Sequence, residues 1–281
     1  MSNAEPITFK ELYSRPRPEP TKVIAYGPAP QQIGDLWLPD GSGPYPTLIV
    51  IHGGCWLAQL PGQQQTAYLA EDLRKHGYAV WNIDYRRIGH TGGGYPGTFL
   101  DAAAAIDKLR ELAQPYRLDL SKVVAIGHSA GGHLATWAAA RRNIPQSSPL
   151  YKAESLPIAG VVSLAGILDL AGYREHGPTA CGGPPTIDAL VGANDRPGEN
   201  PYTDTSPVEL QPIGARLVIV AGTSDPIVPL PYIKAYTDKV IANGDPETMM
   251  SIFSGAGHFE LIDPKSRESD RTRGEIDKLV K

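Results

Sequence analysis

Apolar runs and amphipathic stretches alternate along most of this chain. The central runs are apolar at almost every position, as expected for parallel strands that helices cover on both faces. These runs predict strands at residues 46–51, 79–83, 123–126, 160–164, 216–221 and 249–253. Residues 33–38 alternate between apolar and polar side chains, which predicts an edge strand. The stretches between the runs predict helices at about residues 63–76, 98–112, 132–142, 231–242 and 265–279.

This alternation predicts an α/β fold with a doubly wound, mostly parallel sheet. The 281 residues are expected to form one domain. Residues 1–30 are expected to be an extended N-terminal segment, because Pro16, Pro18 and Pro20 disfavour a helix over residues 14–20. Residues 167–207 are rich in Gly and Pro and follow the carboxyl end of a strand, where pockets of this fold lie, so we expect a short, loop-rich lid there. A surface loop without function is the alternative.

The net charge and the length of the apolar runs argue against several classes of binding partner. The net charge is −4 and no strongly basic block occurs, which argues against binding to nucleic acid or to an anionic membrane surface. No apolar stretch approaches the roughly 20 residues that a membrane span requires. The expected partner is therefore a small molecule, and formation of a homo-oligomer stays open.

The chain has two cysteines, Cys55 and Cys181. They are too few for a disulfide framework and lack the paired spacing of a structural zinc site. We therefore expect reduced cysteines, no bound metal and a cytoplasmic location. Residues 2–4 resemble the remnant of an expression vector, so a natural leader peptide, and with it export, stays open.

Residues 127–131, with the sequence GHSAG, carry the most informative motif. A G-x-S-x-G sequence between a buried strand and a helix presents its serine on a strained turn at the helix N-terminus. The flanking glycines permit that tight turn, and the helix end favours negative charge on a reacting oxygen. Ser129 is thus the candidate nucleophile of an acyl-transfer reaction. The alternative is an ordinary strand-to-helix turn whose serine caps the helix.

Donors for an oxyanion are predicted beside this serine. Gly53 and Gly54 directly follow the strand at residues 46–51, where two glycines can direct backbone N–H groups toward a ligand. The N–H of Ala130, the residue after the serine, would be the second donor. We favour Gly54 over Gly53 as the donor from this loop. An ordinary tight turn is the alternative.

A base and an orienting acid are also predicted at strand ends. Asp225 follows the strand at residues 216–221, and His258 follows the strand at residues 249–253. Ser129, Asp225 and His258 thus occur in the order serine, acid, histidine that an α/β-hydrolase triad requires. Asp263 is the second choice for the acid.

Other candidates for the base or nucleophile are less well placed. His128 is expected to point away from the serine hydroxyl, and His133 is expected to pack on the following helix. His52 is expected to order the oxyanion loop by hydrogen bonding. Cys55 has no histidine partner better placed than that of Ser129, so a thiol nucleophile is not favoured.

The sequences HGGCW, GHSAGGH, AGTSD and GAGHF, in this order, resemble the α/β-hydrolase superfamily. HGGCW and IDYRR are similar to an esterase branch that includes kynurenine formamidases and hormone-sensitive-lipase-like carboxylesterases. The resemblance covers the chain from about Gly34 to the C-terminus. It implies that Tyr85 supports the pocket, that Cys55 lines it, and that Trp56 either lines it or packs in the core. Formamidases of this branch commonly have an aromatic residue where Cys55 stands, and the lipase-like enzymes commonly have a third glycine there.

These residues predict a serine hydrolase that cleaves small carboxylic esters through an acyl-enzyme, with no organic cofactor or metal ion. The first alternative is an amide hydrolase of the arylformamidase type, since the same triad cleaves both bonds. The second is a ligand-binding protein that kept the fold without catalysis. The acyl group, the leaving group and the conformation of residues 167–207 are left undetermined by the sequence.

Overall fold

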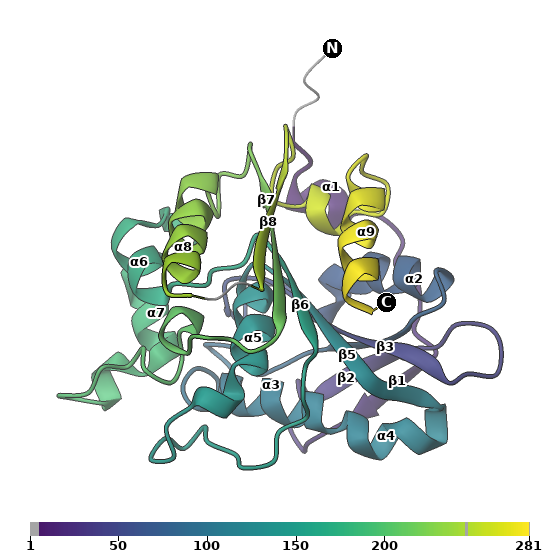
Figure 1. Ribbon diagram of the computed structural model, residues 1–281, viewed down its shortest axis with the longest axis horizontal. Coiled ribbons are helices and arrows are strands. Elements are labelled where there is room, and N and C mark those ends of the chain that lie inside the picture. The colour runs from purple at the N-terminus through teal and green to yellow at the C-terminus, as the bar shows by residue number, and fades with distance from the viewer. Residues whose placement is uncertain (1–5, 245–246, 281) are drawn as a thin grey trace.

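The computed structural model describes residues 6–244 and 247–280. Their core is an eight-stranded sheet with the strand order β1-β2-β4-β3-β5-β6-β7-β8 (Figure 1). The strands are β1 (Lys22–Ala25), β2 (Ile33–Trp37), β3 (Tyr45–Ile51), β4 (Ala79–Ile83), β5 (Leu118–His128), β6 (Gly160–Leu164), β7 (Arg216–Gly222) and β8 (Thr248–Phe253). Strand β2 runs antiparallel to both of its neighbours, β1 and β4, and all the other pairs are parallel. The predicted mostly parallel α/β sheet is confirmed.

Helices cover both faces of this sheet. They are α1 (Phe9–Tyr13), α2 (Ala67–Lys75), α3 (Gly97–Asp107), α4 (Leu109–Tyr116), α5 (Ala130–Ala139), α6 (Leu170–His176), α7 (Pro184–Val191), α8 (Leu230–Ala242) and α9 (Ser269–Val280). Figure 1 shows α2 and α9 on one side of the sheet and α3, α5 and α8 on the other. Because both faces are covered, the central strands β3 to β7 are buried along most of their length, as their apolar sequences predict.

The sequence analysis was wrong about the edge of the sheet. Strand β2, predicted as an edge strand, is covered by β1, which pairs Lys22 with Leu36 and Ala25 with Ile33. Strand β1 is only four residues long and mostly exposed, so it lacks a pattern that marks a buried strand. The helix predicted over residues 98–112 is also divided in two, α3 and α4, which meet at Lys108.

The N-terminal segment is not extended throughout, as predicted for residues 1–30. Helix α1 begins after Thr8, whose hydroxyl accepts a hydrogen bond from the Glu11 N–H while the Glu11 carboxylate accepts one from the Thr8 N–H. This reciprocal cap stabilises a helix of only five residues. Residues 1–5 of the predicted segment lie outside the described residues.

Residues 167–207 contain two helices, α6 and α7, in addition to turns. Their apolar side chains are buried, with Leu170 and Leu190 fully inaccessible to solvent. Helix α7 begins with Pro184 and Pro185 in its first turn and ends at Gly192, which has a positive φ of 65°. The Gly and Pro residues of this segment therefore begin and end helices, in addition to forming the expected loops.

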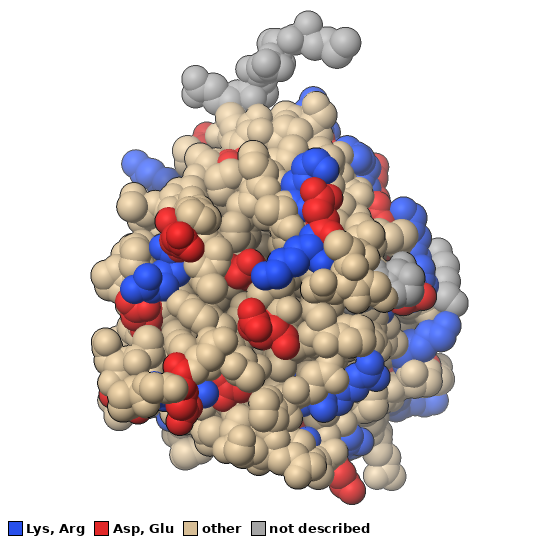
Figure 2. Space-filling model, turned by 60° about the vertical axis from the view of Figure 1, so that its left-hand side comes forward, with Lys and Arg blue, Asp and Glu red and all other residues tan. Residues whose placement is uncertain are grey.

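The face drawn in Figure 2 mixes acidic and basic side chains without a broad area of one sign. Oppositely charged side chains also pair: Arg174 and Asp188 form an ion pair of 2.6 Å between α6 and α7. Among the described residues, no helix is long and apolar enough to cross a membrane.

Candidate active site

Ser129 lies at the sharp turn between β5 and α5. Its backbone has φ 55° and ψ −120°, a conformation that side chains with a Cβ rarely adopt, and its residue surface is only 2% exposed. The two glycines of the motif are required because neighbouring backbone atoms leave no room for a Cβ at either position. A Cβ on Gly127 would lie 2.1 Å from the carbonyl oxygen of Gly131, and one on Gly131 would lie 2.0 Å from the carbonyl oxygen of Ile51. The sequence therefore folds here into the strained turn that the motif predicts.

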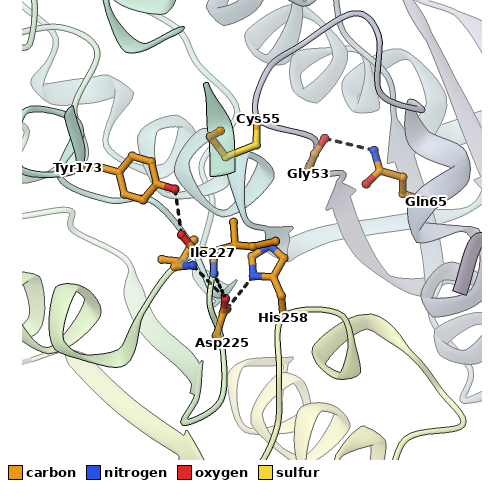
Figure 3. Close-up of a disulfide and its surroundings, with 9 residues drawn as sticks. Gly53, Cys55, Gln65, Tyr173, Asp225, Ile227 and His258 are labelled. Atoms are coloured by element: carbon orange, nitrogen blue, oxygen red, sulfur yellow. Dashed lines mark hydrogen bonds and ion pairs between the residues drawn. A yellow bond between two sulfur atoms is a disulfide. The ribbon is translucent and has the colours of Figure 1, made fainter. Parts of the chain in front are cut away.

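His258 and Asp225 form a buried pair beyond the ends of β8 and β7. Nδ1 of His258 lies 2.6 Å from Oδ2 of Asp225 (Figure 3). The other carboxylate oxygen of Asp225 accepts the backbone N–H groups of Ile227, at 2.8 Å, and Val228, at 2.9 Å. These donors hold the carboxylate in place, so it fixes the orientation of the imidazole ring. Asp263, the second choice for the acid, instead pairs with Arg15 at 2.6 Å.

Ser129 and His258 line the same cavity, of about 170 Å³. Within the described part of the chain, neither Ser129 Oγ nor His258 Nε2 has a hydrogen-bond partner. Both groups are therefore available to a molecule in the cavity. The remaining lining residues come from widely separated segments: Phe9, Gly54, Cys55, Leu60, Gln65, His128, Ala180, Ile227 and Phe259.

Two side chains hold the peptide between Gly53 and Gly54 in the loop after β3. The carbonyl oxygen of Gly53 lies 2.7 Å from His52 Nδ1 and 3.4 Å from Gln65 Nε2. In a trans peptide the next N–H, that of Gly54, points the opposite way. A Cβ on Gly53 would lie 3.0 Å from the His128 carbonyl oxygen and 3.1 Å from the Ser129 Cβ, so a larger residue would crowd the serine turn. The Ala130 N–H, in the first turn of α5, has no acceptor within its helix.

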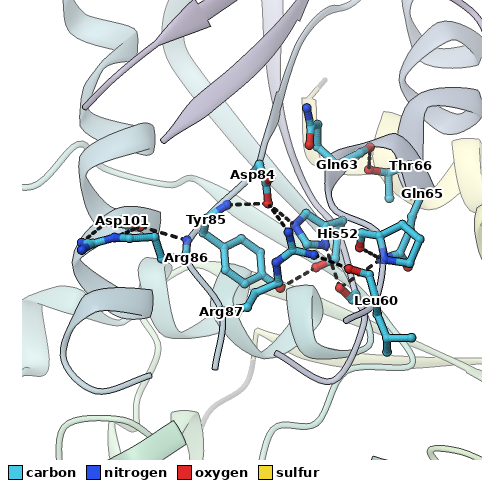
Figure 4. Close-up of polar contacts among 12 residues, drawn as sticks. His52, Leu60, Gln63, Gln65, Thr66, Asp84, Tyr85, Arg86, Arg87 and Asp101 are labelled. Carbon is cyan, nitrogen blue, oxygen red and sulfur yellow. Dashed lines mark hydrogen bonds and ion pairs between the residues drawn. The ribbon is translucent and has the colours of Figure 1, made fainter. Parts of the chain in front are cut away.

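A buried polar network holds this loop from below (Figure 4). Nε2 of His52 lies 3.0 Å from Oδ1 of Asp84, and Arg87 lies 3.4 Å from the same oxygen. Tyr85 stacks on the His52 ring, with 4.4 Å between centroids, and its hydroxyl donates to the His52 carbonyl. Burial opposes ionisation of Asp84, but the hydrogen bond and charge of His52, together with Arg87, leave its pKa lowered. His52 thus orders the loop, and Tyr85 is the buried support that the sequence predicts.

The expectation of reduced cysteines is wrong. Cys55 and Cys181 form a disulfide across 126 residues of sequence (Figure 3). It ties the loop that follows Gly54 to the segment of residues 167–207, and Ala180, next to Cys181, lines the cavity. Residue counting missed this pair because only the fold brings the two positions together. Disulfides are rare in reducing compartments, so this bond speaks against the predicted cytoplasmic location, which stays a prediction.

Two predicted site residues differ in their surroundings. Cys55 lines the cavity as expected, but Trp56 is fully buried and packs edge-on against His133 at 5.3 Å between ring centroids. The structure therefore places Trp56 in the core, away from the cavity lining. Cys55 faces the cavity, whereas Trp56 packs in the core beneath the same loop.

The remaining histidines of the motif are held neutral. Burial, and the proximity of His258, keep the pKa of His128 well below its usual value, and its Nε2 lies 3.0 Å from the His258 carbonyl oxygen. Burial also lowers the pKa of His133 to about 4, and its Nε2 contacts the Thr205 carbonyl at 2.8 Å. Both side chains therefore bind backbone carbonyl groups. Within residues 6–244 and 247–280, no group of three or more His, Cys, Asp or Glu side chains is arranged to hold a metal ion.

The lining residues that sequence reasoning missed are Phe9, Leu60, Gln65, Ala180, Ile227 and Phe259, together with His128, which the sequence analysis did not place at the pocket. Phe259 belongs to the GAGHF sequence and His128 to the GHSAG sequence, and the other five belong to no motif with a fixed spacing. Ile227 and Phe259 lie within two residues of Asp225 and His258, so proximity to the predicted triad is a usable signal for them. Phe9 and Ala180 lie in segments whose position only the tertiary structure determines.

The parallel sheet, the strained serine after β5 and the His–Asp pair beyond β7 and β8 together define an α/β-hydrolase fold. Within that class, the chain belongs to the BD-FAE family, whose sequence model matches residues 35–239. The predicted superfamily is thereby confirmed.

The curated relatives of this chain share about a quarter of its residues over the aligned region. The chain is 25% identical over 225 residues to the esterase LipQ of Mycobacterium tuberculosis, covering 77% of this chain and 52% of LipQ. It is 24% identical over 270 residues to the probable isoprenylcysteine alpha-carbonyl methylesterase ICMEL1 of Arabidopsis thaliana, covering 92% of this chain and 54% of that protein. The chain thus spans about half the length of these curated relatives.

Solved structures share the fold over nearly the whole chain. Esterase B from Lactobacillus rhamnosis has a TM-score of 0.79 at 21% identity, covering 97% of this chain and 89% of its own. A truncated carbohydrate esterase from gut microbiota has a TM-score of 0.73 at 22% identity, covering 93% of this chain and 97% of its own. At these identities the similarity establishes the fold.

Proposed function

We propose that this chain is a carboxylesterase-type serine hydrolase that cleaves small carboxylic esters, with Ser129, His258 and Asp225 as its catalytic triad. The observation that carries the proposal is the shared cavity: a strained serine and a histidine oriented by a buried carboxylate both line it. The names of relatives support the choice of substrate, because LipQ is called an esterase and LipM a probable carboxylic ester hydrolase.

In this mechanism, Ser129 Oγ attacks the ester carbonyl carbon while Nε2 of His258 takes the hydroxyl proton. The hydrogen bond from Nδ1–H to Asp225 leaves Nε2 unprotonated and facing the cavity, and it stabilises the imidazolium that forms. The C–O bond to the alcohol then breaks as His258 returns the proton to the leaving oxygen. Water, deprotonated by His258, attacks the acyl-enzyme and releases the acid and the free serine.

The negative charge on the carbonyl oxygen is stabilised by the N–H groups of Gly54 and Ala130. Gly53 contributes by its lack of a side chain and by a carbonyl that His52 and Gln65 hold in place. A donor fixed in advance needs no reorganisation as charge develops, and loss of one such donor costs about 3 kcal/mol of transition-state stabilisation.

The size of the cavity favours small substrates. Its volume of about 170 Å³ is close to that of a protein cavity of roughly 150 Å³ that holds benzene. One short acyl chain or one aromatic ring therefore fits without movement of the walls. We further propose that the segment of residues 167–207 covers this pocket, since Ala180 contacts it and the disulfide ties it to the oxyanion loop.

Replacement of the proposed nucleophile tests the assignment. Ser129→Ala should lower kcat for p-nitrophenyl acetate at least about 10⁴-fold, since removal of a triad serine abolishes the covalent route. Ser121→Ala, an exposed serine of the same strand, serves as the matched control and should keep full activity. A fluorophosphonate should label the parent protein and the control, but not Ser129→Ala. Undiminished turnover by Ser129→Ala would refute the triad.

The amide-hydrolase alternative is tested with matched leaving groups. Phenyl acetate and formanilide both place an aromatic ring on the leaving atom, so their kcat/KM values compare ester with amide cleavage directly. We expect a preference for the ester, and a preference for the formamide would instead assign an arylformamidase-type activity. Absence of both fluorophosphonate labelling and turnover would instead indicate a ligand-binding protein on the hydrolase fold.

A further inference from the structure

Helix α1 contributes a side chain to the cavity of the catalytic serine. Phe9 is half-buried and lines this cavity with Ser129 and His258. It lies outside residues 35–239, the part of the chain that the family model matches. The wall that Phe9 forms is therefore a feature of this chain beyond the matched family region.

The first attachment of α1 is to the loop of the catalytic histidine. The carboxylate of Glu260 accepts the Ile7 N–H at 2.6 Å through one oxygen and the Gly257 N–H at 3.0 Å through the other. One side chain thus joins the start of α1 to the residue before His258. The Phe9 ring also packs against the Phe259 ring, with 5.5 Å between centroids.

The second attachment of α1 is to the segment that supports the oxyanion loop. The Tyr13 hydroxyl donates to Oε1 of Gln64 at 3.2 Å, and the Tyr68 hydroxyl donates to the carbonyl of Arg15 at 2.7 Å. Gln64 is followed by Gln65, which contacts the Gly53 carbonyl. Helix α1 therefore bridges the two loops that supply the base and the oxyanion donors.

Several contacts make this bridge a fixed part of the structure. Leu12 is almost fully buried, and Arg15 pairs with Asp263 at 2.6 Å. Thr8 and Glu11 cap the helix reciprocally. A short helix has little stability of its own, so these tertiary contacts hold Phe9 against the cavity.

We propose that Phe9 is a specificity-determining residue that limits the size of the leaving group. The proposal rests on the proposed serine-hydrolase function, in which the leaving oxygen must reach His258 to receive its proton. Phe259 packs edge-on against the His258 ring at 5.1 Å between centroids, and Phe9 packs against Phe259. The group attached to the leaving oxygen therefore extends toward Phe9, and the ring of Phe9 limits the space for it.

Two series of esters test this assignment. The first varies the alcohol in acetate esters, from ethyl to phenyl to 1-naphthyl acetate. The second varies the acyl chain in p-nitrophenyl esters, from acetate to hexanoate. For Phe9→Ala, the ratio of kcat/KM for naphthyl over ethyl acetate should rise about tenfold, as expected when about 1.4 kcal/mol of steric cost is removed. The hexanoate-to-acetate ratio should change by less than about twofold.

Control variants distinguish the steric effect of the Phe9 ring from a loss of stability in the N-terminal segment. Phe9→Leu keeps an apolar side chain and replaces Phe9→Ala in the test if the alanine variant folds poorly. Its naphthyl-to-ethyl ratio should lie between that of the parent and the tenfold rise expected for Phe9→Ala. Val23→Ala truncates an exposed apolar side chain of β1, the next element along the chain, and should leave both ratios unchanged. An unchanged alcohol series in both Phe9 variants, or a change confined to the acyl series, would overturn the proposal.

Failure of this proposal differs from failure of the proposed function. If the parent protein hydrolyses esters and fluorophosphonate labels Ser129, but the Phe9 ratios stay constant, only the wall assignment fails. A readout without turnover uses Ser129→Ala protein and measures binding of phenol and 1-naphthol by calorimetry. Phe9→Ala on this background should strengthen binding of naphthol relative to phenol about tenfold, and an equal effect on both alcohols would refute the wall even without catalysis.

Discussion

Two buried histidine–aspartate pairs lie on either side of the candidate nucleophile, and they differ in the second nitrogen of the ring. His258 contacts Asp225 at 2.6 Å, and His52 contacts Asp84 at 3.0 Å. The second nitrogen of His52 lies 2.7 Å from the Gly53 carbonyl. The second nitrogen of His258 has no hydrogen-bond partner among the residues that the structure describes, and its side chain lines the cavity.

The difference shows that a carboxylate partner does not by itself make a histidine a base. Both ring nitrogens of His52 are occupied, one by the Gly53 carbonyl and the other by the Asp84 carboxylate. Such a ring can hold a peptide in place but leaves neither nitrogen facing the serine. In the proposed mechanism, His258 donates through one nitrogen and keeps the other for the serine. The pair beside the cavity performs the proposed chemistry, and the pair below the loop positions the oxyanion donor.

The largest effect is expected at the carboxylate of the cavity pair. Asp225→Asn should lower kcat by about 10⁴-fold, because the amide stabilises the wrong tautomer and no longer balances the imidazolium charge. KM should change little, since substrate binding does not require that charge. Steady-state kinetics with p-nitrophenyl acetate measure both parameters.

Asp263→Asn is the matched control for this comparison. Asp263 lies five positions after His258 in sequence but pairs with Arg15 on the N-terminal segment. Its replacement should change kcat by less than severalfold. A larger loss from Asp263→Asn than from Asp225→Asn would mean that the orienting acid is misassigned.

A smaller loss is expected at the pair below the loop. His52→Gln should lower kcat by about 10- to 100-fold, less than outright removal of an oxyanion donor, because the Gly54 N–H remains but is less well fixed. KM should stay nearly constant, as for a group that acts mainly in the transition state. Fluorophosphonate labelling should slow in parallel with turnover.

Asp84→Asn distinguishes the hydrogen bond that aligns His52 from the negative charge of the Asp84 carboxylate. The amide oxygen of asparagine still accepts the hydrogen bond from His52 but carries no negative charge. If alignment of the loop is what matters, Asp84→Asn should retain more activity than His52→Gln. Equal losses in the two variants would contradict a positioning role for the hydrogen bond.

The smallest expected effect concerns His133, a buried histidine without a carboxylate partner. Its pKa is lowered to about 4 by burial, so the unfolded chain binds a proton there at a higher pH than the folded chain does. Stability is therefore present above about pH 6.5 and is lost as the pH falls toward 4. Between pH 7 and pH 5 this group alone should cost about 2 kcal/mol of unfolding free energy.

Urea unfolding of the parent protein and of His133→Gln at the two pH values measures this contribution. Glutamine still donates to the Thr205 carbonyl but does not titrate, so the difference between the two proteins isolates His133. The parent should lose more stability than the variant on acidification. Identical losses would show that His133 is not held neutral.

The parts of the fold that the sequence predicted are those with a local signal. The strands at residues 79–83 and 160–164 are matched at both ends, because each is a fully buried run. Strand β1 has no such signal, since Lys22 and Val23 face solvent. An exposed strand of four residues is recognisable only through the partner that it pairs with.

The site was predictable to the same extent. Ser129, Asp225 and His258 each follow an apolar run, so the topology alone brings them to one edge of the sheet. Phe9 and Ala180 reach the cavity through packing between segments that are distant in sequence. No periodicity or motif encodes such contacts, because they depend on how loops and a short helix settle on the finished sheet.

The disulfide has a practical consequence for studying this molecule. Cys55 and Cys181 are the two cysteines of the chain, and both are consumed in the bond. A cysteine introduced at exposed Ser14, just after α1, would therefore be the single site for a maleimide fluorophore. The emission of such a probe would report whether the N-terminal helix stays in place during each turnover.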